Sequence, residues 1–237
     1  MLDPRHDDPR HHLATRRPFN KLGDELIDKL AVGSRVIELS RGDCLFHIGE
    51  KPEHVFLILR GMLQLRRTTA KDEHSLMALF GTGDVPAIPV LLSGGRYGAD
   101  AVVVSAHLSA LRVPAGPLLE LAETDVRVAT AFNRALLDHV RALHEKVAIL
   151  SAGSVEQRLA KLFAVLCERF GDELEGGSHC VPIVLTRAEI AAFVSARVET
   201  VIRTLSLWQK RGIVTSNEDG FEISDPQVLQ SILRGDA

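Results

Sequence analysis

The stretch Leu185–Val214, LTRAEIAAFVSARVETVIRTLSLWQKRGIV, decides the fold of the last third of this chain. Thr186 precedes a helix-forming run and Glu189 follows three positions later, which is the signature of a capping box at a helix start. The helix predicted from there covers Arg187–Val194. A tight turn and a second helix over about Arg197–Arg211 follow, and the next glycine ends that helix. The stretch therefore predicts two helices joined by a short turn.

A β-hairpin is predicted directly after these helices. Ile213–Thr215 and Phe221–Ile223 have strand character, and Asn217–Gly220 between them has turn composition. The 38 residues from Thr186 to Ile223 thus read helix, turn, helix, hairpin. This order is typical of a winged helix-turn-helix, whose second helix lies in the major groove of DNA.

The spacing within the second helix indicates which side would face DNA. Val201, Leu205 and Trp208 share one stripe that would pack on the first helix through Ile190 and Phe193, and the opposite side is polar. On that polar side an arginine can pair with guanine and a glutamate can accept from cytosine. Residues at helix N-termini suit phosphate. The residues predicted to face solvent or DNA are Ser195, Glu199 and Arg203, and the predicted phosphate contacts are Thr186, Arg187 and Arg197. The alternative is a surface ion pair between Glu199 and Arg203.

The local charge supports this assignment, although the net charge of the whole chain does not. The 237-residue chain has a formal net charge of −3. Within Thr186–Gly212, however, five basic residues face two acidic ones, a balance of +3. Concentrated positive charge of this kind can follow a line of phosphates.

The composition is that of an ordinary globular protein of one large or two modest domains. Apolar residues make up 46% and charged residues 25% of the chain. No apolar run reaches about 18 residues, so no membrane span is predicted. The start, MLDPRHDDPRHH, lacks the apolar stretch of a secretory signal, and we expect a cytosolic protein. The three scattered cysteines, Cys44, Cys167 and Cys180, fit reduced thiols better than disulfides.

The first half of the chain has the pattern of an antiparallel β-barrel or jelly roll, so the predicted fold class is α+β. Residues 1–18 are polar and are expected to form a flexible arm, in which clustered histidines could bind metal but are usually inert; a short helix over about Lys21–Leu30 follows. Short strands separated by glycine-containing turns then extend to residue 115. The predicted strands are Val36–Leu39, Leu45–Ile48, Val55–Arg66 interrupted by Gly61, Ser75–Phe80, Ala101–Val104 and Leu108–Val113.

From about residue 116 to 151 the periodicity is helical. Apolar residues recur every seven positions in two interleaved series, the pattern of a two-stranded coiled coil. The alternative is a helix packed on its own barrel. Ser151–Ser154 then breaks the helix, and a hinge is predicted at residues 152–154, where the DNA-binding domain of residues 152–237 begins. The predicted dimerisation residues are Ala129, Phe132, Leu136, Val140, Leu143, Val147 and Leu150.

Three segments together resemble the CRP/FNR family of transcription regulators. Leu185–Val214 is similar to the family signature, most specifically at Glu199-Thr200-x-x-Arg203. In the barrel, Gly42-Asp43-x-Leu45-Phe46-x-x-Gly49-Glu50 and VFLILRG at 55–61 resemble the strands of its nucleotide-binding fold. SVEQRLAKLF, residues 154–163, resembles the helix that opens its DNA-binding domain. The resemblance covers roughly residues 19–225 and implies a homodimeric, double-stranded-DNA-binding regulator, with RNA polymerase as a partner if it activates.

The resemblance also implies roles for individual residues. Glu199 and Arg203 would read the central bases of each half-site. The residues that would hold phosphates are Thr186, Arg187, Ser195 and Thr200. Val198 departs from the arginine of the cyclic-AMP receptor type and agrees with the FNR type, so we expect an inverted repeat of half-sites nearer TTGA than GTGA. Ile202 departs from the serine of FNR-like members, which leaves the outer base preference open.

The sensor residues argue against the effectors that the family suggests. Cyclic-nucleotide binders of the family carry a glutamate for the ribose and an arginine for the phosphate, and here Ile88 and Gly98 stand at those positions. Arg96 lies two residues away, and Pro86 and Pro89 remove backbone donors. No cysteine precedes Cys44, which argues against an iron–sulfur cluster. Haem on one of His47, His54, His74, His107, His139 or His144, a redox-active cysteine, an apolar ligand and a vestigial sensor in a constitutively active regulator all remain open.

The alternative hypothesis from another functional class is an enzyme with a regulatory barrel. The chain contains no P-loop, GxSxG, HExxH or CxxC motif. We therefore expect no catalytic activity, and a mechanism in which a signal at the barrel shifts the populations of the hinge so that both reading helices can enter DNA.

Overall fold

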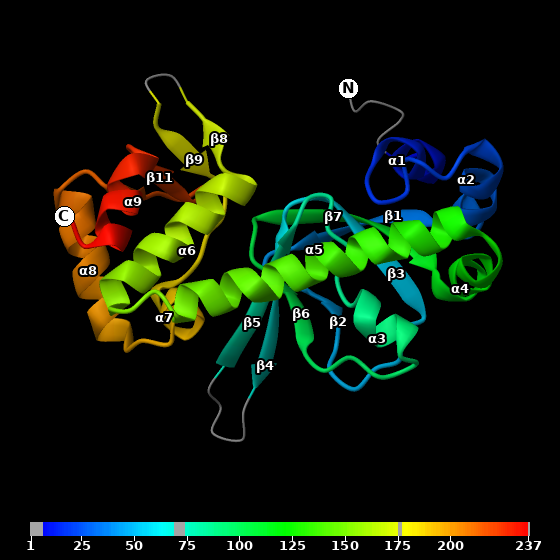
Figure 1. Ribbon diagram of the computed structural model, residues 1–237, viewed down its shortest axis with the longest axis horizontal. Helices are drawn as coiled ribbons and strands as arrows, with labels where there is room; N and C mark the ends of the chain where they lie inside the picture. Colours follow the sequence, from blue (N-terminus) through cyan, green and yellow to red (C-terminus); the bar gives the residue numbers. More distant parts are fainter. Residues whose placement is uncertain (1–6, 69–73, 175–176, 237) are drawn as a thin grey trace. The chain divides into compact units, whose positions relative to one another are not determined.

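The computed structural model describes residues 7–68, 74–174 and 177–236 and divides into two compact units (Figure 1). The first contains the residues up to 67 together with 78–103 and 107–142. The second contains 68–77, 104–106 and 143–237. The division falls within the long helix α5 (Val126–Leu150), between Ala142 and Leu143.

Two antiparallel sheets form the centre of the first unit. One has the order β1-β7-β3, with β1 at Arg35–Ser40, β3 at His54–Arg60 and β7 at His107–Pro114. The other has the order β2-β6-β4-β5, and its strands are β2 at Cys44–Phe46, β6 at Asp100–Val103, β4 at Met62–Thr68 and β5 at His74–Gly81. The predicted antiparallel barrel of short strands is confirmed.

Alternation along the strands separates two cores. On β3, Phe56 and Ile58 point into a cluster that also contains Leu63 and Val103 from the other sheet. Their neighbours, including Leu57, belong to a second cluster that is shared with the helices of this unit and is called the helix-side core below. This period of two is what places one face of the sheet inside the barrel and the other beneath helices.

Helices cover the outer face of the three-stranded sheet. They are α1 (Pro9–Thr15), α2 (Asp24–Ala31), α4 (Ala115–Thr124) and the N-terminal part of α5, and Figure 1 shows α1, α2 and α4 grouped near the start of α5. A fifth short helix, α3 (Ile88–Leu92), lies in the connection between β5 and β6.

The helix α1 corrects the prediction of a flexible arm over residues 1–18. Its Leu13 is fully buried in the helix-side core. Its Arg10 forms ion pairs with Asp24 at 2.8 Å and Asp28 at 2.6 Å on α2. Long-range contacts of this kind order a segment whose composition alone favours disorder. Residues 1–6 of the predicted arm lie outside the described residues.

The second unit is built around α6 (Val155–Phe170). A four-stranded sheet has the order β10-β11-β9-β8, and the helices α7 and α8 precede the β10–β11 hairpin. The remaining bounds are β8 at Asp172–Glu173, β9 at His179–Val181, α7 at Arg187–Val194, α8 at Val198–Lys210, β10 at Val214–Ser216, β11 at Phe221–Ile223 and α9 at Pro226–Arg234.

One boundary in this unit is set by a proline, and another differs from the sequence prediction. β9 ends at Val181, because Pro182 has no N–H to continue the pairing. The second helix of the motif begins at Val198 rather than Arg197, which is its N-cap. The break predicted after the long helix is present: α5 ends at Leu150, and Ser154 caps α6 with a complete capping box.

Aromatic packing fixes the core of this unit. Phe163 of α6 is fully buried, and its ring lies edge-on to Trp208 of α8 at 6.1 Å and to Phe221 of β11 at 5.1 Å between centroids. One ring therefore joins the scaffold helix to both the second helix of the motif and the hairpin.

Candidate DNA-binding surface and sensor cavity

The first helix of the motif starts as the sequence predicts. The Thr186 hydroxyl oxygen accepts from the Glu189 backbone N–H at 3.1 Å, and the Glu189 carboxylate accepts from the Thr186 backbone N–H at 2.7 Å. The Thr186 hydroxyl also contacts that carboxylate at 2.9 Å. The side chain of this predicted phosphate contact is thus engaged in capping its own helix.

The turn between the two helices is held in an unusual backbone conformation. Ser195 ends α7 with φ of 49°, in the left-handed region, and its side chain is exposed. Because α8 starts three residues later, Ser195 does not continue the helical series of Glu199 and Arg203. Ser195 therefore lies in the turn, and the expectation that it shares their helix face is corrected.

Two basic side chains that sequence reasoning missed support this turn. Arg158 of α6 donates to the carbonyls of Val194 at 2.8 Å and Ser195 at 3.1 Å. Lys146 donates to the Phe193 carbonyl, and its ammonium lies 4.1 Å from the centroid of the Phe193 ring. Both cations sit at the C-terminal end of α7, where the helix dipole favours positive charge. In the sequence they look like ordinary polar positions of amphipathic helices.

The buried face of α8 is the one predicted. Val201, Leu205 and Trp208 are buried, and α8 packs against α7, whose Ile190 is also buried. The Trp208 indole N–H donates to the Glu156 carboxylate at 3.1 Å. This contact satisfies the one polar atom of a fully buried ring and fixes the rotation of α8 about its own axis.

That rotation leaves Glu199 and Arg203 on the exposed side of α8. Within residues 7–68, 74–174 and 177–236, neither side chain has an ion-pair or hydrogen-bond partner. The alternative of a surface ion pair between them is not formed there. Both charged groups are therefore available to another molecule.

The other predicted DNA contacts differ in their exposure and in their hydrogen-bond partners. Arg197 is exposed at the start of α8, while Val198 and Thr200 are half-buried. Arg187 donates to the Ser216 hydroxyl on β10 at 2.8 Å, and burial lowers the pKa of its guanidinium. Arg187 thus ties the first helix to the hairpin.

Positive charge gathers along the exposed side of α8. Arg197, Arg203, Lys210 and Arg211 are exposed, against the single exposed carboxylate of Glu199 on this helix, a balance of +3. An exposed helix with two free charged side chains and this balance of charge is the class of surface that fits the major groove of DNA.

The predicted dimerisation residues on α5 divide into two groups. Phe132 is only 3% exposed and belongs to the helix-side core of the first unit, so its ring faces inward. Ala129 and Leu136 are half-buried. An apolar stripe is exposed further along: Leu137 at 68%, which the sequence prediction omitted, Val140 at 42%, Leu143 at 37%, Val147 at 60% and Leu150 at 39%.

The first unit contains an open cavity of about 590 Å³. Phe46 and Tyr97 stack in its wall with ring centroids 3.8 Å apart, and burial together with Glu50 raises the pKa of Tyr97 to about 12. The lining residues are Ile37, Leu45, Phe46, Glu50, Lys51, Glu53, His54, Phe56, Arg96, Tyr97 and Arg112. The cavity thus combines aromatic surface with both signs of charge.

The segment between β5 and β6 holds two of the residues that the sequence analysis compared with nucleotide binders, Ile88 and Arg96. Ile88 is 1% exposed and packs in the helix-side core. The Arg96 guanidinium, the nearest candidate for a phosphate, donates to the Gly49 carbonyl at 2.8 Å. Ala87 before the helix has φ of 64°, a conformation that a non-glycine residue adopts only when its surroundings enforce it.

The thiols and histidines also have defined surroundings. Burial raises the pKa values of Cys44, Cys167 and Cys180, which favours protonated thiols over reactive thiolates. Burial lowers the pKa of His139, whose ring stacks on Phe80. His54 lines the cavity, and its Nδ1 lies 3.2 Å from the Arg112 guanidinium.

Comparisons with known proteins agree with this class. A family model described as a cyclic nucleotide-binding domain matches residues 36–125, and one described as a Crp-like helix-turn-helix domain matches residues 157–232. The chain belongs to the CRP/FNR family of transcription regulators, and that family is not one of enzymes.

Relatives extend over nearly the whole chain. The CRP-like cAMP-activated global transcriptional regulator of Mycobacterium tuberculosis is 25% identical, over 92% of this chain and 96% of the relative. Electron transport regulator A of Shewanella oneidensis is 23% identical, over 93% of this chain and 86% of the relative. The structure of FixK2 from Bradyrhizobium japonicum shares the fold, with a TM-score of 0.70, 20% identity, and coverage of 84% of this chain and 96% of that one.

Among the described residues, none of the helices combines the length and apolar character that a membrane crossing requires.

Proposed function

We propose that this regulator binds DNA as a homodimer, at an inverted repeat of TTGA-type half-sites, and that the barrel controls the binding. The observation that carries the proposal is the pair Glu199 and Arg203, both exposed and without a partner among the described residues of the chain. The helix that carries them is anchored on its other side by Trp208. A rigid helix with two adjacent free charged groups suits direct reading of a guanine and a cytosine.

The homodimer follows from the apolar stripe of α5. Val140, Leu143, Val147 and Leu150 are separated by three, four and three residues, the spacing of a coiled-coil seam, and all four are exposed. Exposed apolar side chains in one line favour burial against a second copy. Two copies related by a two-fold axis would bind two half-sites about one helical turn of DNA apart, which is why an inverted repeat is expected.

A binding experiment on synthetic duplexes tests the site. Fluorescence anisotropy should give tighter binding to an inverted repeat of TTGA half-sites than to one of GTGA by about 2–6 kcal/mol, because each of the two half-sites then holds one wrong base pair that costs roughly 1–3 kcal/mol. Arg203→Ala should weaken binding to the TTGA duplex by about 1–3 kcal/mol per half-site and reduce discrimination at its guanine. Equal affinity for both duplexes, or an Arg203→Ala variant that discriminates like the wild type, would contradict the proposal.

Arg211→Ala is the matched control. This arginine is exposed at the end of α8 but lies two turns beyond Arg203. Its loss should weaken binding to every duplex about equally and reduce the salt dependence, as expected for a phosphate contact. If Arg211→Ala lowered the affinity for the TTGA duplex alone, the residues that contact bases would lie at the end of the helix instead.

Control by the barrel is the second part of the proposal, and its cavity is the place where we expect a signal to act. Operator affinity measured with and without haem, cyclic nucleotide or oxidant separates a sensor from a constitutively active regulator. A visible spectrum of the protein as purified from cells tests haem directly. We further propose a cytosolic protein that contacts RNA polymerase at activated promoters; transcription in vitro with purified polymerase distinguishes activation from repression.

A further inference from the structure

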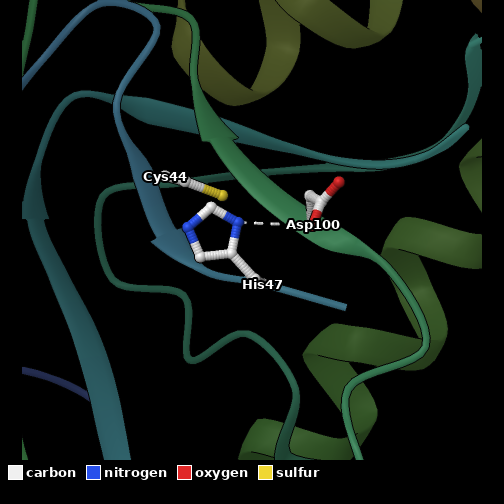
Figure 2. A group of neighbouring side chains, drawn as sticks. All are labelled: Cys44, His47 and Asp100. Carbon is white, nitrogen blue, oxygen red and sulfur yellow. Dashed lines mark ion pairs between the residues drawn. The ribbon is translucent and has the colours of Figure 1, made fainter. Parts of the chain in front are cut away.

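Three side chains with metal-binding donors converge at the edge of the β2–β6 sheet. Cys44 begins β2, His47 directly follows it and Asp100 begins β6. Their thiol sulfur, an imidazole nitrogen and a carboxylate oxygen all lie within 4.8 Å of one another. Figure 2 shows the Cys44 sulfur beside the imidazole ring of His47, and a dashed line joins a nitrogen of that ring to the Asp100 carboxylate.

The backbone brings Asp100 close to Cys44 and His47, although about half of the barrel sequence lies between Asp100 and these two residues. β2 and β6 pair antiparallel, with a register shift between Cys44 and Phe46. The pairing continues beyond the strand, because the Val103 N–H donates to the Asp43 carbonyl at 2.9 Å. A bulge of this kind redirects side chains at a sheet edge. The convergence is therefore built into the strand pairing.

The carboxylate is held in place by the chain itself. The Ile48 backbone N–H donates to Asp100 Oδ1 at 2.9 Å, and the same oxygen lies 3.6 Å from His47 Nδ1. The turn that carries His47 is fixed at its other end, where the Gly49 N–H donates to the Tyr97 carbonyl at 2.8 Å. Hydrogen bonds that orient a ligand in this way are typical of metal sites.

The donor set selects a class of ion. One thiolate, one imidazole and one carboxylate are all accepted by zinc, whereas magnesium and calcium prefer oxygen alone. Tetrahedral zinc separates nitrogen and oxygen ligands by about 3.3–3.4 Å, and sulfur from either by about 3.5 Å, given its usual bond lengths. The 3.6 Å between His47 and Asp100 is near that value, and 4.8 Å is the upper limit for all three pairs. Small side-chain rotations would complete the geometry.

We propose that Cys44, His47 and Asp100 bind one divalent transition-metal ion of the zinc class, with water in the fourth position. The His47 side chain is 63% exposed, so solvent reaches this side of the site. The Cys44 thiol now donates to the Phe46 carbonyl at 3.1 Å. Binding replaces that proton with the metal and releases it to solvent, and the imidazole and carboxylate donate lone pairs without further change.

A bound ion would also act on the barrel cavity. The turn from His47 to Glu50 is closed by the Glu50 N–H, which donates to the His47 carbonyl at 3.2 Å, and Glu50 lines the cavity. An ion that joins His47 to β2 and β6 would stiffen this wall. We therefore expect metal to alter the response of operator binding to signals. This last step rests on the proposed function, whereas metal binding itself does not.

Cobalt titration of the full-length protein, stripped with a chelator and kept reduced, tests the site. Co²⁺ should bind at one equivalent and give a thiolate-to-cobalt charge-transfer band, and Zn²⁺ should displace it. Cys44→Ser should abolish that band. His47→Gln and Asp100→Asn should each weaken Zn²⁺ by at least the roughly 10- to 100-fold that even indirect changes at metal sites cost.

The controls separate this site from adventitious ligands. Cys180→Ser removes a different half-buried thiol, beside His179, and His11→Gln removes a half-buried histidine of α1. Both variants should bind Co²⁺ and Zn²⁺ like the wild type. Serine and asparagine keep the hydrogen bonds of Cys44 and Asp100, and circular dichroism with thermal unfolding checks that each variant folds. A charge-transfer band that survives Cys44→Ser, or one lost in Cys180→Ser, overturns the proposal, as does Zn²⁺ affinity unchanged in all three ligand variants.

Operator affinity with and without Zn²⁺ tests the consequence for the barrel. A change seen in the wild type and absent in Cys44→Ser supports it. If the wild type binds the operator with the same affinity with and without Zn²⁺, the proposed effect of metal on regulation is overturned, whereas metal binding is not. Failure to bind any operator would refute the proposed function, whereas the cobalt titration would still decide whether the metal site exists.

Discussion

The hydrogen bonds from Arg158 to the turn of the helix-turn-helix motif lead to a prediction that links stability to DNA binding. Arg158→Met keeps most of the apolar stem and removes the guanidinium that binds the carbonyls of Val194 and Ser195. The turn then loses its support from α6. We expect a less stable second unit and a reading helix that is less firmly oriented.

The contacts set the magnitude. Hydrogen bonds to charged groups contribute about 1.5–3 kcal/mol each, and a cation at a helix C-terminus adds about 0.3–1 kcal/mol. Ser195 is exposed, so water can replace the donor at its carbonyl, whereas Val194 is buried. The free energy of unfolding should therefore fall by about 2–3 kcal/mol, most of it from the Val194 carbonyl.

Urea unfolding and operator anisotropy, measured on the same samples, provide the assay. Lys161→Met on the same helix is the matched control, because it removes one positive charge that has no hydrogen-bond partner within the described part of the chain. Its effect should stay within about 0.5 kcal/mol. Equal unfolding midpoints for the Arg158 and Lys161 variants would refute the argument. An Arg158 variant that is destabilised but binds operator with wild-type affinity when folded would restrict the role of Arg158 to stability.

Three other features lead to measurable predictions. Glu156→Ala leaves the Trp208 indole N–H buried without a partner and should cost about 1–3 kcal/mol in urea unfolding, whereas Glu156→Gln keeps an acceptor and should cost less. Burial lowers the pKa of Lys146 from 10.5 to about 8, so the unfolded chain binds more protons between these values and the folded state gains stability as pH rises through them. Relative to Lys146→Met, the wild type should gain roughly 1–2 kcal/mol between pH 7.5 and pH 10, discounted for partial exposure, and a pH-independent difference would contradict this origin of the shift. Val147→Lys puts a charge in the exposed stripe and should shift light-scattering mass toward the monomer, while a dimer of unchanged affinity would place the interface elsewhere.

The elements that the sequence predicted well are those defined by local rules. The first helix of the motif follows from the capping box of Thr186 and Glu189, whose two hydrogen bonds are present. The barrel strands follow from alternation and glycine turns, and the buried stripe of α8 follows from helical spacing. Each of these signals lies within a few residues of the feature that it predicts.

Features that depend on distant contacts could not be predicted in the same way. The helix α1 is ordered by partners on α2 and by burial of Leu13, none of which its own composition reveals. On α5 the heptad pattern identifies an apolar side, but only the packing shows that Phe132 faces its own core while Leu137 is exposed. The support of the turn by Arg158, and the meeting of Cys44 with Asp100, likewise arise from tertiary structure.

The burial of Ile88 has a consequence for how this barrel can change in evolution. The sequence resemblance places this side chain where cyclic-nucleotide binders of the family carry glutamate, and in the structure it fills an apolar core. A carboxylate at this position would place a charge or an unpaired acid group in that core, at a cost of several kcal/mol, before any ligand could compensate. By the same resemblance an arginine would be needed at Gly98 as well. We therefore expect that single substitutions alone would not give this barrel nucleotide binding, because the first of them lowers its stability.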